Sequence, residues 1–203
     1  MSKYFQKYPN NENKAITHYH LNIMVSESFY PILSILEVSL RNSLNRELTT
    51  FFGTENWHLE IELIPTLNSL TNDINTAKKH ILNRNESITA SKVTAELTLG
   101  FWVKLLNTKY EQILWKPLRK AFPYLEKINR QRKTVSAPLN KIRNFRNRVF
   151  HHEPISWNFS ELENTHKEII QVMGWINKDL PLIIAEMDRV ENVLKSAKIR
   201  LNE

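Results

Sequence analysis

The chain has 203 residues, of which 41% are hydrophobic, and its formal net charge is +7 at pH 7. This apolar content can bury the core of one sizeable domain, and the lack of cysteine excludes disulfides, thiol catalysis and thiolate zinc sites. Only three glycines occur, which argues against a turn-rich all-β fold and against a glycine-rich phosphate loop.

The N-terminal segment, MSKYFQKYPNNENK, is polar and lacks the apolar region that a signal peptide carries. No run of about 18 apolar residues occurs, so we predict no membrane-spanning helix. We expect a cytoplasmic protein without a membrane partner. The basic charge suggests a polyanionic partner, most simply nucleic acid, although many small basic proteins have no such partner.

Apolar residues recur at helical spacing along the chain, and strand-like alternation is nowhere sustained. We therefore predict one all-α domain over residues 1–203, a helical bundle of about seven helices. The helices are expected over residues 14–27, 29–52, 66–84, 90–107, 109–121, 133–152, 159–177 and 181–201. Residues 54–65 are expected to form a loop or a short helical turn.

Prolines and glycines mark several expected boundaries. Pro31 should bend the chain or separate the first two helices, and Gly53 is expected to end the second. Gly100 lies inside a predicted helix, where glycine costs about 1 kcal/mol relative to alanine. The close approach of another backbone would explain that glycine.

The segment 143–154, RNFRNRVFHHEP, gathers three arginines, two asparagines and two histidines in one predicted helix. Pro154 disfavours the helical conformation at the residue before it, so this helix should end near the two histidines. Asn147 and His151 are i,i+4 neighbours, and their side chains can touch. Arg146 lies about 140° away from His151 around an ideal helix. It could join His151 through its long stem, by local unwinding, or across a subunit interface.

Histidine, arginine and asparagine side chains together supply the groups that are needed to cleave RNA without a metal ion. The helix dipole favours the protonated form of a histidine near a helix C-terminus, and such a histidine can serve as general acid or base. Arginine can bind a phosphate and stabilise the charge that develops on it, while asparagine can orient either group. The dipole alone also favours such residues at a helix end, so a purely structural interpretation stays open. Because His151 and His152 diverge by about 100°, they are poor metal ligands, and we predict neither a metal nor another cofactor.

The segment Arg146–His151 resembles the R-N-x-x-x-H form of the R-x4–6-H motif of HEPN-domain ribonucleases. The continuation HHEPI at 151–155, with Trp157 nearby, is similar to the Abi-like (abortive infection) family of bacterial proteins. Three further stretches resemble segments of that family: HYHLN at 18–22, LEVSLRNSLNREL at 36–48 and LTLGFWVKLL at 97–106. Residues 13–160 are the most family-like, and 161–203 are expected to form C-terminal helices.

The resemblance implies an all-α HEPN-like fold that forms a homodimer, with both copies of the motif facing one cleft. It implies that Arg146 and His151 are the catalytic pair and that Asn147 assists them. The implied function is a metal-independent endoribonuclease that acts as a toxin in bacterial phage defence. An antitoxin or a phage-derived trigger would then be a further partner. Some HEPN domains only bind RNA, so the alternative is a non-catalytic module that binds RNA or a nucleotide.

Other polar residues are candidates for RNA contact. They are Arg143, Arg148 and His152 near the motif, and Arg41, Asn42, Arg130, Arg132 and Lys133 elsewhere. Phosphate contacts from the basic run at 129–133 would be sensitive to salt, although such a run is usually a solvated face. Glu37 and Arg41 are i,i+4 neighbours, and their structural interpretation is an ion pair that braces the site helix or a dimer interface.

Overall fold

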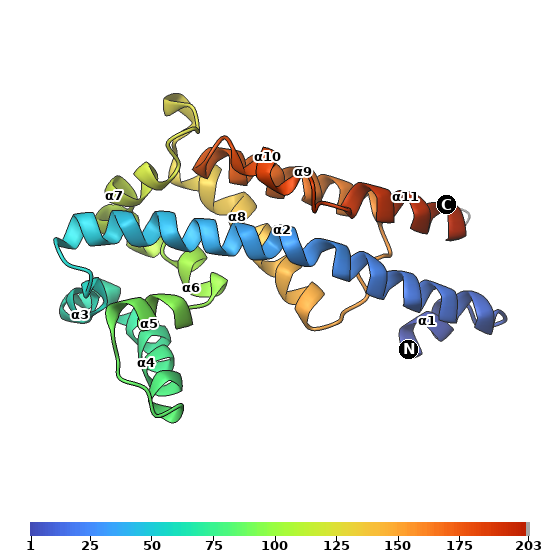
Figure 1. The fold of residues 1–203 in the computed structure, drawn as a ribbon, viewed down its shortest axis with the longest axis horizontal. Coiled ribbons are helices and arrows are strands. Elements are labelled where there is room, and N and C mark those ends of the chain that lie inside the picture. The colour runs from blue at the N-terminus through green and yellow to red at the C-terminus, as the bar shows by residue number, and fades with distance from the viewer. Residues whose placement is uncertain (202–203) are drawn as a thin grey trace.

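The structure is a computed structural model that describes residues 1–201. These residues contain eleven α-helices and no strand (Figure 1). The helices are α1 (Ser2–Lys7), α2 (Glu12–Phe52), α3 (Trp57–Leu63), α4 (Asn68–Asn83), α5 (Ala90–Glu96), α6 (Leu99–Lys104), α7 (Lys116–Leu118), α8 (Arg132–Phe150), α9 (Phe159–Ile176), α10 (Leu180–Ile184) and α11 (Val190–Leu201). The all-α prediction is confirmed, whereas the predicted number of helices is too low.

Helix α2, with 41 residues, is the axis of the molecule. Its first turn is capped by Asn11, whose side chain accepts a hydrogen bond from the backbone N–H of Lys14. It ends at Gly53, where φ is 72°, a left-handed conformation that glycine adopts without strain. Helices α8, α9 and α11 pack along α2, while α6 and α7 contact the half that ends at Gly53 (Figure 1).

By length and composition, α2 could also cross a membrane, since its most apolar 18-residue window has a mean hydropathy of 1.4. This differs from the prediction of no spanning helix. It is weak evidence, because the central helix of a helical bundle passes the same test. In this fold, 44% of the window is already buried by the rest of the chain.

Pro31 lies inside α2 and does not separate two helices, so that part of the prediction is wrong. A proline in a helix interior costs about 3 kcal/mol, because it removes one hydrogen bond and crowds the preceding turn. The neighbouring side chains of Phe29, Ile32, Leu33 and Leu36 are all buried, and each contributes about 1.5–3 kcal/mol of apolar burial. Packing therefore outweighs the cost of the proline.

The segment predicted as one helix over 90–107 forms α5 and α6, because the chain between them is extended at Leu97. The indole N–H of Trp102 donates to the Leu97 carbonyl (3.1 Å). The Glu37 carboxylate accepts from the backbone N–H of Leu99 (3.0 Å). Side chains thus satisfy backbone groups that a continuous helix would have paired internally.

Three other local predictions differ from the structure. Residues 109–121 form short 3-10, π and α turns, and residues 181–201 are divided into α10 and α11. No other backbone approaches Gly100, since a Cβ placed there would meet only the Thr98 hydroxyl, at 3.4 Å, within the described chain. The close-approach explanation of this glycine is therefore wrong. Helices α4, α8 and α9, in contrast, lie within two residues of their predicted ends.

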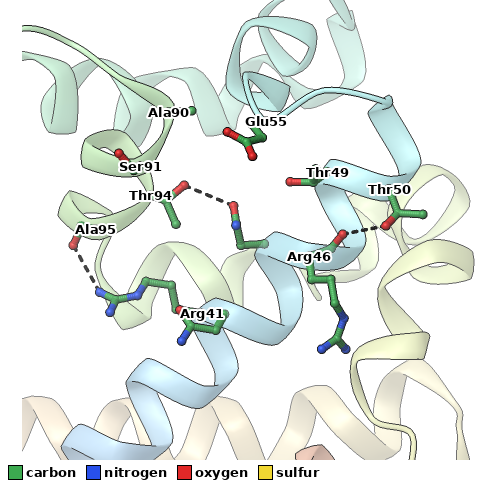
Figure 2. A pocket seen from close by; sticks show the side chains of 11 residues that line it. Arg41, Arg46, Thr49, Thr50, Glu55, Ala90, Ser91, Thr94 and Ala95 are labelled. Atoms are coloured by element: carbon green, nitrogen blue, oxygen red, sulfur yellow. Dashed lines mark hydrogen bonds between the residues drawn. The ribbon is translucent and has the colours of Figure 1, made fainter.

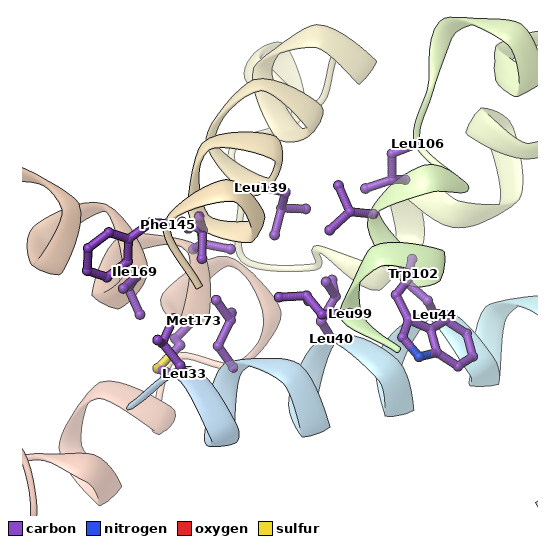
Figure 3. Close-up of a cluster of buried hydrophobic side chains, with 14 of the residues drawn as sticks. Leu33, Leu40, Leu44, Leu99, Trp102, Leu106, Leu139, Phe145, Ile169 and Met173 are labelled. Atoms are coloured by element: carbon purple, nitrogen blue, oxygen red, sulfur yellow. The ribbon is translucent and has the colours of Figure 1, made fainter. Parts of the chain in front are cut away.

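One face of α8 is buried in the hydrophobic core (Figure 3). Its buried side chains include Ile142, Phe145 and Val149, as the sequence predicted. They belong to one cluster with Leu33, Leu40 and Leu44 of α2, Leu99 and Trp102 of α6, and Ile169 and Met173 of α9. Because three other helices fix the apolar face, the polar face of α8 is held at the surface in one orientation.

Candidate functional site

Helix α8 ends in a turn that exposes two histidines. His151 is the C-cap, and its backbone N–H still donates to the Asn147 carbonyl (2.9 Å), so the helical register continues to this residue. The next residue, His152, has a φ of 55°, which is uncommon for a residue with a side chain. The backbone N–H of Glu153 donates to the Arg148 carbonyl (2.9 Å), as in a Schellman motif. The predicted end of this helix is thus confirmed.

Asn22 of α2 holds the loop that follows the histidines. Its Oδ1 accepts hydrogen bonds from the backbone N–H groups of Ile155 (2.8 Å) and Ser156 (3.0 Å) and from the Ser156 hydroxyl (3.0 Å). Its Nδ2 donates to the Glu153 carbonyl (3.2 Å). The buried ring of His18 adds a hydrogen bond with the Ser156 carbonyl (3.0 Å). The HYHLN stretch therefore fixes the backbone of this loop.

Arg146 is positioned by an acid and an aromatic ring. Its Nη2 lies 3.5 Å from Oε2 of Glu37, and its guanidinium carbon lies 4.2 Å from the centroid of the Phe150 ring. The Arg146 and Glu37 side chains are 27% and 23% exposed, and the Nε of Arg146 is buried without a hydrogen-bond partner in residues 1–201. The pair is long and engages only Nη2 of the guanidinium, which therefore keeps donors for an anion.

The predicted ion pair between Glu37 and Arg41 is not formed. Glu37 contacts Arg146 and the backbone N–H of Leu99 instead, while Arg41 donates to the Ala95 carbonyl (3.4 Å). Both side chains find partners on other helices, which i,i+4 spacing alone does not reveal. Glu37 still has a bracing role, because it joins α2 to α6 and to α8.

Arg146 and His151 are not in contact: within residues 1–201 they share no hydrogen bond or ion pair. Their divergence around the helix persists because α8 is regular up to its C-cap, so the local unwinding considered above does not occur. The side chains of Asn147 and His151 are exposed, one turn apart. The long stem of Arg146 or a second copy of the chain is left as the means of joining the two groups.

The other arginines near the motif have local partners. Arg148 Nε lies 3.4 Å from the Glu153 carboxylate, and its Nη2 donates to the Pro154 carbonyl (3.0 Å), so Arg148 braces the turn. Arg143 donates to the side-chain oxygen of Asn144 (3.2 Å) at the surface. Of the two, Arg143 is the more available for a further contact.

The basic run at 129–133, which leads into α8, is mostly engaged within the chain. Arg130 donates to the carbonyls of Leu125 (2.6 Å) and of Pro123. Arg132 pairs with Glu111 (2.8 Å), and its side chain is 15% exposed. These contacts give both arginines a structural role. Lys133 is exposed, and its ammonium group makes no hydrogen bond in the described chain.

Arg41 and Asn42 line a pocket of about 510 Å³ between α2 and α5 (Figure 2). Its remaining walls come from Asn45, Arg46, Thr49, Thr50, Glu55, Ala90, Ser91, Thr94 and Ala95. The histidine end of α8 lies elsewhere on α2, because the ring of Phe150 contacts that of Tyr30 (4.9 Å). Tyr30 and Arg41 are about 16 Å apart along the helix. One chain therefore does not bring this pocket and the histidines into one site.

Sequence reasoning missed three contributions to the site. The loop-holding role of Asn22 was not predicted, although an asparagine among the apolar residues of a helix is a signal for a buried hydrogen-bonded group. The partner of Glu37 was wrongly assigned. The contact of Arg146 with Phe150 could have been found, because the two residues are i,i+4 neighbours.

Residues 1–201 hold no group of three or more histidine, aspartate or glutamate side chains that could bind a metal ion. Comparisons with protein-family models, curated proteins and solved structures give no significant match for this chain. The fold and the site define an all-helical protein with a basic surface helix that ends in two exposed histidines. What this protein does is inferred from the chemistry of that helix end.

Proposed function

We propose that the chain is a metal-independent endoribonuclease with a HEPN-like fold. The observation that carries this proposal is the exposed imidazole of His151 at the end of a basic helix. Asn147 lies one turn before it, and Arg146 carries a partly exposed, weakly paired guanidinium on the same helix. An acid–base group, an anion ligand and a polar orienting group are thereby held on one rigid element.

In the proposed reaction, the neutral imidazole of His151 removes the proton from a ribose 2′-OH. The 2′-oxygen forms a bond to the adjacent phosphorus, and the bond from phosphorus to the 5′-oxygen breaks. A water molecule donates a proton to the leaving 5′-oxygen, and the imidazolium of His151 returns its proton to solvent. The products carry a 2′,3′-cyclic phosphate and a 5′-OH. Arg146 stabilises the charge on the phosphate oxygens, and Asn147 orients the imidazole or the phosphate.

The proposal includes a homodimer, because the two groups diverge within one chain. If two α8 helices face each other, Arg146 of one copy can act beside His151 of the other. Glu37 and Phe150 then hold the guanidinium in a defined place without saturating it, since the 3.5 Å pair leaves donors for a phosphate. Glu37 has a positioning role and touches no substrate.

The first experiment measures cleavage of labelled RNA by the purified protein in EDTA, followed by analysis of the RNA ends. We expect 2′,3′-cyclic phosphate ends and a loss of cleavage in His151→Ala and Arg146→Ala. Arg200→Ala is the matched control, because Arg200 is exposed on α11. Circular dichroism verifies that all variants remain helical. Undiminished cleavage by a variant that carries both His151→Ala and Arg146→Ala would refute this site.

Mixing the two inactive variants tests the shared site. In a heterodimer of His151→Ala and Arg146→Ala chains, one of the two composite sites has both groups intact. Random exchange of subunits should then restore about a quarter of wild-type activity, because half of the dimers are mixed and each has one working site. If both groups act within one chain, mixing restores nothing.

The alternative is a non-catalytic module that binds RNA or a nucleotide. The lack of contact between Arg146 and His151 favours it, because it leaves the acid–base group without its anion ligand in a single copy. This module would bind RNA with a steep dependence on salt and leave it intact. For the enzyme, we further propose a cytoplasmic, toxin-like role in phage defence, released by a phage-derived trigger or restrained by an antitoxin.

A further inference from the structure

A second pocket, of about 420 Å³, lies between α2 and the turn that ends α8. Its lining includes Tyr19, Ser26, Glu27 and Tyr30 of α2, and His152 faces them from the turn. His152 is the chain neighbour of His151, and consecutive Cα atoms are about 3.8 Å apart. The pocket therefore begins beside the proposed acid–base group.

Aromatic rings give this pocket surfaces on which a nucleobase can stack. Tyr30 is partly exposed, and the ring of Phe150 backs it at a centroid distance of 4.9 Å and an interplanar angle of 30°. Tyr19 is also partly exposed, but it lies about 16 Å away along the helix, too far to share one base with Tyr30. Stacking on aromatic rings is the usual way in which proteins hold unstacked bases of single-stranded RNA.

The polar groups at the Tyr30 end can read the edge of a base. Glu27 is exposed, and its Oε1 accepts from Arg189 (3.1 Å) in a surface pair with side chains 60% and 59% exposed. Its Oε2 has no hydrogen bond within residues 1–201. The hydroxyl oxygen of Ser26 is buried and has no hydrogen-bond partner in the described chain, although its residue lines the pocket. This hydroxyl can donate to a group that binds at this end of the pocket.

The charge of Glu27 sets the type of base. An ionised carboxylate only accepts hydrogen bonds, so it pairs with the exocyclic amino groups of adenine, cytosine and guanine. Uracil has a carbonyl oxygen, which a carboxylate repels, where cytosine has its amino group. Only the ring N3–H of uracil is left as a donor on this edge. Arg189, beside Glu27, supplies positive charge for the phosphates on either side of that base.

The strained backbone of His152 is an independent observation at the same place. The residue occupies the position of a Schellman motif where glycine is most common, yet it carries an imidazole that lines the pocket. Strain of this kind is typical of functional sites, where the side chain is needed despite its cost.

We infer that this pocket is a nucleobase subsite, which binds one unstacked base of single-stranded RNA and prefers a base with an exocyclic amino group over uracil. The inference rests on the proposed function for its RNA ligand. It adds the choice of base, with Tyr30 as the stacking surface, Glu27 as the selecting group, and His152 closing the pocket next to the scissile phosphate.

Binding can be tested without cleavage by using fluorescently labelled, fully 2′-O-methylated hexamers, which lack the attacking hydroxyl. C6 and U6 have the same ring size, so their comparison isolates the amino group. We expect the wild-type chain to bind C6 about tenfold more tightly than U6, the difference that one charge-assisted hydrogen bond gives. Glu27→Gln should abolish this preference, and Tyr30→Ala should weaken binding of both hexamers.

Glu12→Gln is the matched control, because it makes the same change of charge at an exposed position at the start of α2, and it should retain the preference. Equal affinity for C6 and U6, a preference that survives Glu27→Gln, or no binding of either hexamer would overturn the inference. RNA cleavage without base preference would leave the proposed enzyme standing and remove the subsite. A preference that depends on Glu27 without cleavage of any RNA would support the subsite and the non-catalytic module.

Discussion

Replacing His152 by glycine should stabilise the protein while removing a wall of the base pocket. The residue has a φ of 55° and an exposed side chain that makes no hydrogen bond within residues 1–201. The left-handed conformation costs a residue with a side chain about 1–2 kcal/mol. Glycine avoids this cost but loses about 0.5–1 kcal/mol through its more flexible unfolded state. At the midpoints of these two ranges, the net gain in the free energy of unfolding is about 0.8 kcal/mol.

For a chain of this size, a gain of this magnitude raises the midpoint of thermal unfolding by about 1–4 °C. Scanning calorimetry of the wild type and of His152→Gly measures the shift. A second turn in the same chain provides the control: Asn85 has a φ of 57°, and the backbone N–H of Glu86 donates to the Ile81 carbonyl (3.2 Å) in the same motif after α4. Asn85→Gly should stabilise by less, because asparagine tolerates this conformation, and it should leave RNA binding unchanged. A fall of several degrees in His152→Gly would show that the imidazole itself stabilises the fold, and this reasoning would be refuted.

Three further predictions test the fold. Asn22→Leu leaves the donors of Ile155 and Ser156 without their acceptor and should lower the unfolding free energy by about 3 kcal/mol in urea titrations. Asn22→Asp keeps this acceptor but places an oxygen against the Glu153 carbonyl, so it should destabilise by less than Asn22→Leu without being neutral. Gly100→Ala meets only an ordinary contact and should stabilise by about 0.4–1 kcal/mol, while a loss of stability would reveal crowding not seen here. Burial, with a nearby positive charge, holds the pKa of His58 below its ordinary value of 6.5. As the pH drops, the unfolded chain therefore takes up a proton on His58 before the folded chain does, and the stability should fall as the pH drops through about 6.5. Urea titrations at several pH values measure this fall in the wild type and in His58→Gln. If the wild-type midpoint moves no more with pH than that of His58→Gln, the prediction is contradicted.

Periodicity in the sequence was sufficient to predict the strongly amphipathic elements. Helices α4, α8 and α9 were placed nearly correctly, because a wide apolar stripe facing one core leaves little choice of helix face. The predictions failed where a tertiary contact overrode local preference. Pro31 is tolerated because its neighbours are deeply buried, and the chain breaks at Leu97 because Trp102 and Glu37 satisfy the freed backbone groups.

The same distinction holds for the candidate site. The end of α8 could be predicted, because Pro154 acts on its immediate neighbour through steric contact alone. The partner of Arg146 could not, because Glu37 is 109 residues earlier in the chain and single-sequence patterns contain no information about such pairs. Asn22 and the loop that it holds, more than 130 residues apart, are a second example.

The regularity of α8 has a consequence for the proposed chemistry. A flexible helix end could bring Arg146 and His151 together on demand, but here Ile142, Phe145 and Val149 are locked in the core, and Asn22 holds the following loop. The divergence of about 140° between the two groups is then a fixed property of one copy. Any cleavage that needs both groups must recruit the arginine through its long stem or from a partner chain. If the Arg146 side chain reaches His151 within one chain, cleavage per chain is independent of protein concentration, whereas a site shared with a partner chain depends on it. Mixing the two inactive variants also distinguishes these cases, because only a shared site restores activity.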